Sequence, residues 1–95
     1  MWDRWDVECE KGATFGDLYE ILAKKYELNP VGVLQGMSRI DTGKGEEAKK
    51  AFMKEKILDK LDMDDNYIDV IVLFTKSAED EKIIEGVPPV RLLFK

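Results

Sequence analysis

The sequence predicts a single α+β domain in which a sheet packs on one main helix. Residues 15–28 repeat apolar side chains at helical spacing, as an amphipathic helix does. Residues 66–76, "NYIDVIVLFTK", are rich in β-branched and aromatic side chains, which favour strands. Shorter strand-like segments open the chain at 5–9 and close it at 90–95. Strands and helices interspersed along so short a chain indicate a sheet covered by helices.

Length and composition limit the classes of protein that this chain can be. With 95 residues, 44% of them hydrophobic, it is long enough for one domain and too short for two. The single cysteine excludes an internal disulfide and fits a reducing compartment, which we expect to be the cytoplasm or the nucleus. Histidine, the most common general base and metal ligand, is absent from the sequence.

The charge balance limits the choice of partners. The formal net charge is −5, so nucleic acids and anionic membranes, which attract positive surfaces, are poor partners. The sequence has no run of about 18 apolar residues for a membrane span and no signal-peptide pattern. We therefore expect a monomer with no nucleic acid and no membrane partner. A basic surface on another protein is the partner that the charge favours.

The opening strand, "WDRWDVEC" at 2–9, has two chemically different faces. Period-2 alternation places Trp5, Val7 and Cys9 on the core face. The other face carries the charged residues Arg4, Asp6, Glu8 and Glu10, and Trp2 shares its parity. Cys9 has no histidine to activate it and is expected to be a buried structural thiol. Trp2 breaks the alternation, so we predict that Trp2→Ala leaves the fold nearly intact whereas Trp5→Ala costs about 3–5 kcal/mol.

Residues 15–28 carry the start and stop signals of a helix. Thr14 is a favourable N-cap, and Asp17 three positions later suits both a capping box and the helix dipole. The pair Asn29-Pro30 should end the helix, because a residue before proline is pushed out of the helical region. The apolar stripe expected to face the sheet consists of Phe15, Leu18, Tyr19, Leu22, Ala23 and Tyr26.

The middle of the chain predicts one strand and a weaker helical region. "VGVLQGMSRI" at 31–40 is apolar and β-branched, and Gly36 within it indicates one strand with a bend or bulge. Residues 46–61 are expected to form one broken helix or two short ones, because their apolar pattern is loose. The apolar residues that lean to one side of this region are Ala48, Ala51, Phe52, Leu58 and Leu61.

The strand predicted at 66–76 has apolar residues on both of its faces. One face carries Ile68, Val70, Val72 and Phe74. The other face includes Ile71 and Leu73, which indicates that this side is partly covered or offered to a partner. "VRLLFK" at 90–95 is expected to pair with this strand in the antiparallel direction.

Between these two strands lies an acidic loop, and two interpretations of it stay open. Its carboxylates, Glu79, Asp80, Glu81 and Glu85, flank the aliphatic pair Ile83-Ile84. A soluble hairpin tip would account for this composition. A docking patch would account for it equally well, because acidic groups steer a basic partner while exposed aliphatic groups supply contact area.

Two motifs that could carry chemistry lack residues that the chemistry needs. In "DTGKGEE", Gly45 follows Lys44 at the position where a phosphate-binding loop needs Ser or Thr for magnesium. In the segment that begins "DMDDN", a calcium loop would need glycine in place of Tyr67 and a bidentate glutamate in place of Leu73. The residues therefore predict no metal site and no catalytic residue.

Four segments together resemble the C-terminal ubiquitin-fold domain of ubiquitin-activating enzymes. They are "WDRWDV" at the start, "VLQG" after the first helix, "YIDVIVLF", and "VPPVRLLF" at the end. The similarity runs along nearly the whole chain in the same order and at similar spacing. "WDRW" followed by a strand and a helix opened by threonine is its most specific part. Within the family, the chain looks most similar to the second, non-classical ubiquitin-activating enzyme of animals.

The resemblance implies a β-grasp, ubiquitin-like fold: a mixed sheet packed on one main helix plus a smaller second helix. It implies that residues 1–95 are one non-catalytic domain of a larger enzyme, in contact with its other domains. Those other domains use ATP and magnesium, so no cofactor is expected in this chain. In this family the domain recruits the charged ubiquitin-conjugating enzyme, whose basic N-terminal helix docks on an acidic face. Carried over by position, the partner-binding residues are Leu73, Phe74, Asp80, Glu81 and Glu85.

Other functions remain open from the residues alone. A free-standing ubiquitin-like modifier needs a flexible tail that ends in Gly-Gly, whereas this chain ends in "RLLFK". A stand-alone β-grasp adaptor with an unrelated basic partner is compatible with the same surface, because a fold does not fix a function. An independent enzyme is the least favoured of these alternatives.

Overall fold

The computed structural model describes residues 4–95, which form a mixed five-stranded sheet and three helices. The chain begins with strand β1 (Trp5–Cys9) and helix α1 (Phe15–Tyr26), followed by strands β2 (Asn29–Gln35) and β3 (Ser38–Asp41). Two short helices come next, α2 (Glu46–Lys54) and α3 (Ile57–Lys60), and then strands β4 (Tyr67–Thr75) and β5 (Val90–Phe94). The prediction made for Trp2 concerns a residue outside the described range.

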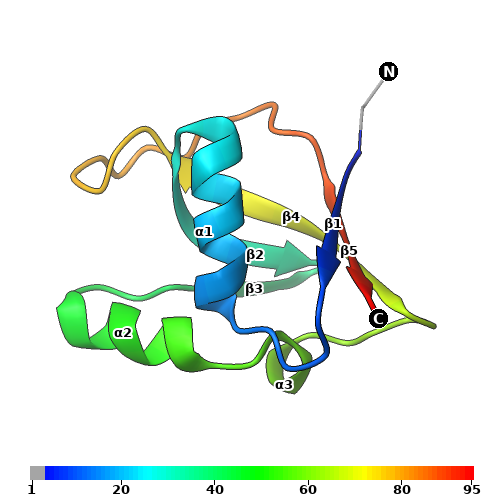
Figure 1. Ribbon diagram of the computed structural model, residues 1–95. Coiled ribbons are helices and arrows are strands. Elements are labelled where there is room, and N and C mark those ends of the chain that lie inside the picture. The colour runs from blue at the N-terminus through cyan, green and yellow to red at the C-terminus, as the bar shows by residue number, and fades with distance from the viewer. Residues whose placement is uncertain (1–3) are drawn as a thin grey trace.

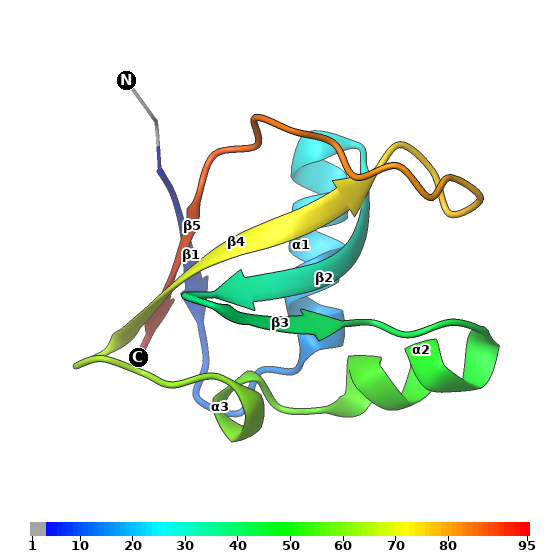
Figure 2. The ribbon, with the colours of Figure 1, turned by 180° about the vertical axis from the view of Figure 1, so that it is seen from behind.

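The sheet has the strand order β1-β5-β4-β2-β3. Its first and last strands in sequence, β1 and β5, are parallel neighbours, with Trp5 opposite Val90. The other pairs are antiparallel, including β4 with β5, as predicted for the last strand. Helix α1 crosses one face of the sheet (Figure 1), and from behind, the helix lies beyond the strands (Figure 2). This α+β arrangement is compatible with a β-grasp, ubiquitin-like fold.

The core lies between α1 and the face of the sheet that the helix covers. The predicted inner residues of β4 are all buried, from Phe74 at 0% exposure to Val70 at 3%. Helix α1 contributes the buried residues Phe15, Leu18, Tyr19 and Leu22. On β1, Val7 and Cys9 are buried and Trp5 is half-buried, packed against the same core. The alternation read from the sequence therefore identifies the inner face correctly.

Helix α1 begins as predicted and ends two residues earlier. The Asp17 N–H donates to Thr14 Oγ1 at 3.1 Å, and the Thr14 N–H donates to Asp17 Oδ2 at 3.0 Å, which is a capping box. The helix ends at Tyr26 because Glu27 adopts a left-handed conformation with φ 54° and donates its N–H to the Ala23 carbonyl. Asn29 and Pro30 already belong to β2.

The prediction of one bent strand over 31–40 is wrong, because this segment belongs to a hairpin. Strands β2 and β3 pair in antiparallel fashion, with Gln35 opposite Ser38. Gly36 has a φ of 59°, which glycine adopts without steric cost at the first position of a two-residue turn. Apolar residues on both sides of the glycine gave the appearance of a single interrupted strand.

The region 46–61 contains two short helices, one of the two outcomes expected from its loose pattern. Phe52 of α2 is buried, and its ring stacks on Phe15 with 4.5 Å between ring centroids. Gly16 permits this contact, since a Cβ at that position would lie 2.8 Å from the Met53 carbonyl oxygen. Ala48 and Ala51, which the sequence grouped with Phe52 on one side of this region, are exposed. Helix α2 therefore contacts the core through Phe52 and the half-buried Met53.

Candidate functional site

The predicted acidic loop connects β4 to β5 and spans residues 76–89. In Figures 1 and 2 it is the gold-to-orange segment that projects beyond the end of β4 and then returns toward β5. Glu79, Asp80, Glu81 and Glu85 are all exposed. The loop therefore presents a group of carboxylates to solvent at one end of the sheet.

A chain of hydrogen bonds fixes the first half of this loop to the sheet. The Asn29 side-chain amide on β2 donates to Thr75 Oγ1 at 3.0 Å, and that hydroxyl donates to the Ser77 carbonyl at 2.7 Å. The Ser77 hydroxyl then donates to Asp80 Oδ2 at 2.8 Å. Thr75 is only 2% exposed, so the first two bonds are sheltered from water. These bonds therefore hold the Asp80 carboxylate and the start of the loop in place before any partner binds.

The second half of the loop runs beside the end of β4. The Ile84 N–H donates to the Phe74 carbonyl at 2.8 Å and so brings the loop back beside the strand. Ile83, Ile84 and Val87 are half-buried there and line a shallow groove together with Leu73 and Ile71. Leu73 is 8% exposed under this cover, whereas Ile71, two residues earlier, is 46% exposed. An apolar surface therefore adjoins the carboxylates.

The predicted site residues fall on two different sides of the sheet. Asp80, Glu81 and Glu85 lie together around one hollow of the loop, and Leu73 lies beside Glu85 in the apolar groove. Phe74 points the other way, into the core, where its ring lies 5.4 Å from that of Tyr26. Because Phe74 is 0% exposed, it has no surface to offer a partner in this conformation. The role of these residues in partner binding stays a prediction.

Ile71 was not among the predicted site residues, although it is the exposed apolar residue nearest to the loop on β4. The sequence did show that Ile71 and Leu73 share the outer face. It did not show which of the two the returning loop would cover, because that depends on contacts between segments distant in sequence.

At the far end of the outer face, the charges are paired with one another. Arg91 donates two hydrogen bonds to Asp69, at 2.7 and 2.8 Å, and lies 4.1 Å from the centroid of the Tyr67 ring. The hydrogen bond from Arg91 lowers the pKa of the Asp69 carboxyl. Arg4 and Asp6 form a further pair at 2.8 Å. Because these charges are already paired with each other, the carboxylates of the 76–89 loop are more available to a partner.

Two groups with potential chemistry are buried in the core. Burial raises the pKa of the Cys9 thiol, which keeps it protonated and poorly nucleophilic. Burial also raises the pKa of Tyr19 to about 12, and its hydroxyl shares a hydrogen bond of 3.0 Å with Thr42 Oγ1. Within residues 4–95, no group of three or more His, Cys, Asp or Glu side chains is placed to hold a metal ion. The helices of this range are all too short or too polar to cross a membrane.

Comparison with known proteins supplies one informative relative. No family model matches the chain. Over 96 aligned residues the chain is 28% identical to ubiquitin-like modifier-activating enzyme 6 of Homo sapiens, an alignment that covers 99% of this chain and 9% of that enzyme. The chain is related to part of such an enzyme. It therefore spans about a tenth of the length of the curated relative it matches.

Proposed function

We propose that this chain is a non-catalytic domain of a ubiquitin-activating enzyme that recruits ubiquitin-conjugating enzymes for transfer of the activated modifier. The observation that carries the proposal is an anchored loop with four exposed carboxylates beside an exposed apolar strand residue. We define the docking surface as Ile71, Glu79, Asp80, Glu81, Ile84 and Glu85. The similarity to part of a modifier-activating enzyme supports the assignment of this surface to such an enzyme.

The two halves of the docking surface contribute in different ways. The carboxylates attract a basic partner over a distance and raise the rate of association, more than they add to final affinity. Ile71 and Ile84 offer the apolar area that holds the partner once it has docked. A surface of this size buries little area, so we expect a dissociation constant in the micromolar range or weaker.

The proposal assigns the chemistry of activation to other parts of the parent enzyme. ATP and magnesium would bind there, and this chain would contribute contact area and charge. Its partners would be the conjugating enzyme and the neighbouring domains of the same enzyme. The cytoplasm and the nucleus are the compartments proposed for it.

An NMR titration tests the proposal directly. The isotope-labelled 95-residue chain is titrated with a panel of ubiquitin-conjugating enzymes at about 50 mM and at about 300 mM salt, which shortens the Debye length from about 14 Å to about 6 Å. We expect at least one enzyme to shift resonances of residues 71–86, with a weaker dissociation constant at the higher salt.

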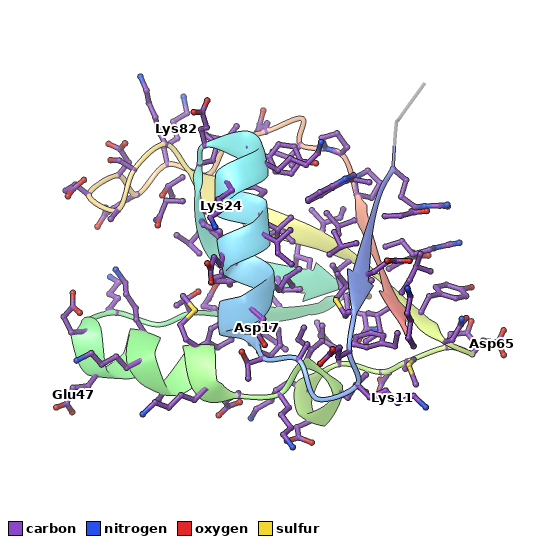
Figure 3. All side chains as sticks on the ribbon, viewed as in Figure 1. Lys11, Asp17, Lys24, Glu47, Asp65 and Lys82 are labelled. Atoms are coloured by element: carbon purple, nitrogen blue, oxygen red, sulfur yellow. The ribbon has the colours of Figure 1, made fainter. Side chains whose placement is uncertain are left out.

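Variants sharpen the same titration. Glu79→Gln with Glu81→Gln removes two carboxylates and keeps Asp80, which holds Ser77. We expect this double variant to weaken binding about 5-fold or more and to reduce its salt dependence. Glu47→Gln serves as the matched control, because Glu47 lies at the outer end of α2, away from the loop (Figure 3). If no conjugating enzyme shifts any resonance, recruitment is wrong, and an adaptor with an unrelated basic partner takes its place.

A further inference from the structure

A groove separates the acidic loop from the connection between β3 and α2. Its volume is about 570 Å³, which accommodates several side chains of a partner. The two segments that border it project on the same side of the molecule in both views (Figures 1 and 2). One wall carries three carboxylates, and the other carries three basic residues and one acid; the charged lining residues are Glu79, Asp80 and Glu81 on the first and Arg39, Asp41, Lys44 and Lys49 on the second. The groove therefore has walls of opposite charge.

The charges on these walls are not neutralised across the groove. Arg39 is already paired with Asp41 on its own strand, with 2.7 Å between Nε and Oδ1. In the described part of the chain, Lys44 and Lys49 enter no ion pair, and neither do Glu79 and Glu81. The basic wall thus keeps two free ammonium groups.

Among the charges of opposite sign near the walls, Asp41 lines the groove and is paired with Arg39, whereas Lys82 and Glu47 lie outside it. Lys82 of the acidic loop is on the side of the loop that faces away from α2, and Glu47 points outward from the far end of α2 (Figure 3). Neither residue lines the groove. The Arg39–Asp41 pair is neutral, so the charge of the basic wall comes from its two lysines, and that of the acidic wall from the loop carboxylates.

Hydrogen bonds to the sheet and to α1 hold the backbone of both walls in place. On the basic side, the Thr42 N–H donates to the Val31 carbonyl at 3.0 Å, and its buried hydroxyl bonds to Tyr19. On the acidic side, the bonds from Asn29 through Thr75 to the loop fix the other wall. Asn29, Val31 and Thr75 also line the groove. The separation of the walls is thus preformed, which lowers the entropy lost on binding.

We propose that this groove selects the charge polarity of the docked partner. The partner segment that occupies it places a basic group toward Glu79 and Glu81 and an acidic group toward Lys44 and Lys49. This inference rests on the proposed function, because the segment is taken to belong to the conjugating enzyme. It makes Lys44 and Lys49 specificity-determining residues: a segment that is basic throughout is repelled by their wall, and a bipolar segment fits in one direction only.

A bipolar groove and a purely acidic docking surface predict opposite effects on binding when Lys44 and Lys49 are removed. If only the carboxylates attracted the partner, Lys44 and Lys49 would oppose a basic segment. Their removal would then strengthen binding. If the groove holds a bipolar segment, their removal leaves the partner's acidic group without its counter-charge, and binding weakens.

The test measures dissociation constants for the 95-residue chain and the conjugating enzyme that binds it in the titration above. Lys44→Gln with Lys49→Gln removes the two unpaired ammonium groups of the basic wall and keeps the Arg39–Asp41 pair. Lys50→Gln with Lys54→Gln is the matched control, because both lysines are exposed on α2 and neither lines the groove. Thermal unfolding of each variant confirms that the fold is retained. We expect the dissociation constant to rise about 3- to 10-fold for the groove variant and less than about 2-fold for the control.

The outcomes separate the inference from the proposed function. An unchanged or lower dissociation constant for the groove variant, with weaker binding by the Glu79→Gln and Glu81→Gln variant, overturns the bipolar groove and leaves recruitment standing. Weaker binding by the groove variant, with no effect of the glutamate variant, also overturns it, since the acidic wall is then not engaged. Absence of any conjugating enzyme that binds overturns both.

Discussion

The two faces of the sheet follow the same strands and differ sharply in how they are covered. Along β4, the inward residues Ile68 and Phe74 are at most 1% exposed and belong to the core on the side of the sheet that carries α1. The outward residues change along the strand: Asp69 is exposed, Ile71 is 46% exposed and Leu73 is 8% exposed. A face covered by a helix is uniformly apolar. On the face that is covered only by the returning loop, the aliphatic residues of β4 are limited to Leu73, beside the loop, and its neighbour Ile71.

The outer face thus has three zones in sequence order along β4. The Asp69–Arg91 pair makes the first zone polar and self-satisfied. Leu73 lies in the last zone, sheltered by the 76–89 loop. Ile71 lies between them with neither a polar partner nor a cover, which is why the proposed docking surface begins there.

The first prediction compares two residues of one strand. Phe74→Ala should lower the free energy of unfolding by about 3–5 kcal/mol, because it removes a fully buried ring and leaves a cavity against α1. Ile71→Ala should lower it by less than about 1 kcal/mol, since much of the side chain is already in water. Urea denaturation of the two variants measures the difference.

The same two variants distinguish packing from binding. Ile71→Ala should weaken the conjugating enzyme's binding while the fold stays intact. Similar losses of stability for the two variants would show that the outer face is as tightly packed as the inner one, which contradicts the exposure of Ile71.

The second prediction concerns the edge of the inner face. The Trp5 ring meets Tyr26 edge-on, with 5.7 Å between centroids, and the Lys25 ammonium lies 4.7 Å from its centroid. The sequence alone predicts a cost of about 3–5 kcal/mol for Trp5→Ala, as for a fully buried ring; because Trp5 is half-buried in the structure, we expect about 2–3 kcal/mol in urea denaturation. Lys25→Ala is the control and should cost less than about 1 kcal/mol. A larger effect of Lys25→Ala would assign the stabilisation to the cation rather than to the ring.

The sequence predicted the inner face well because the signals for it are local. Alternation along β4 and the capping box at Thr14 and Asp17 depend on residues close in sequence, and both are confirmed. The hairpin at Gly36 was missed because a turn glycine and a bulge glycine look alike without the pairing of β2 with β3. A local pattern does not contain that pairing.

The candidate site was predictable only in part, for the same physical reason. The carboxylates of the loop were placed correctly on the surface, since charged residues in a turn-rich segment stay in water. Phe74 was assigned to the site by resemblance and lies in the core. The basic wall of the groove, with Lys44 and Lys49, lies about 30 residues away in sequence from the acidic wall. No spacing rule connects the two.

The last prediction tests the polar zone of the outer face through pH. The hydrogen bond from Arg91 lowers the pKa of Asp69 in the folded protein, so the ionised carboxylate stabilises the fold at pH values above its unfolded pKa of about 3.9. This contribution is lost as the pH falls through the lower, folded pKa. The Asp69 side chain is 50% exposed, so solvent screening keeps the contribution below about 1 kcal/mol.

Asp69→Asn should therefore have a lower free energy of unfolding than the unaltered chain, by the same amount at pH 7 and at pH 5. This difference should shrink below about pH 4. Urea denaturation at each pH measures it. Arg91→Gln provides the control, because in that background Asp69→Asn should have little further effect. A difference that persists undiminished at about pH 2 would mean that the amide disturbs packing instead. The Asp69–Arg91 ion pair would then not be what stabilises the polar zone.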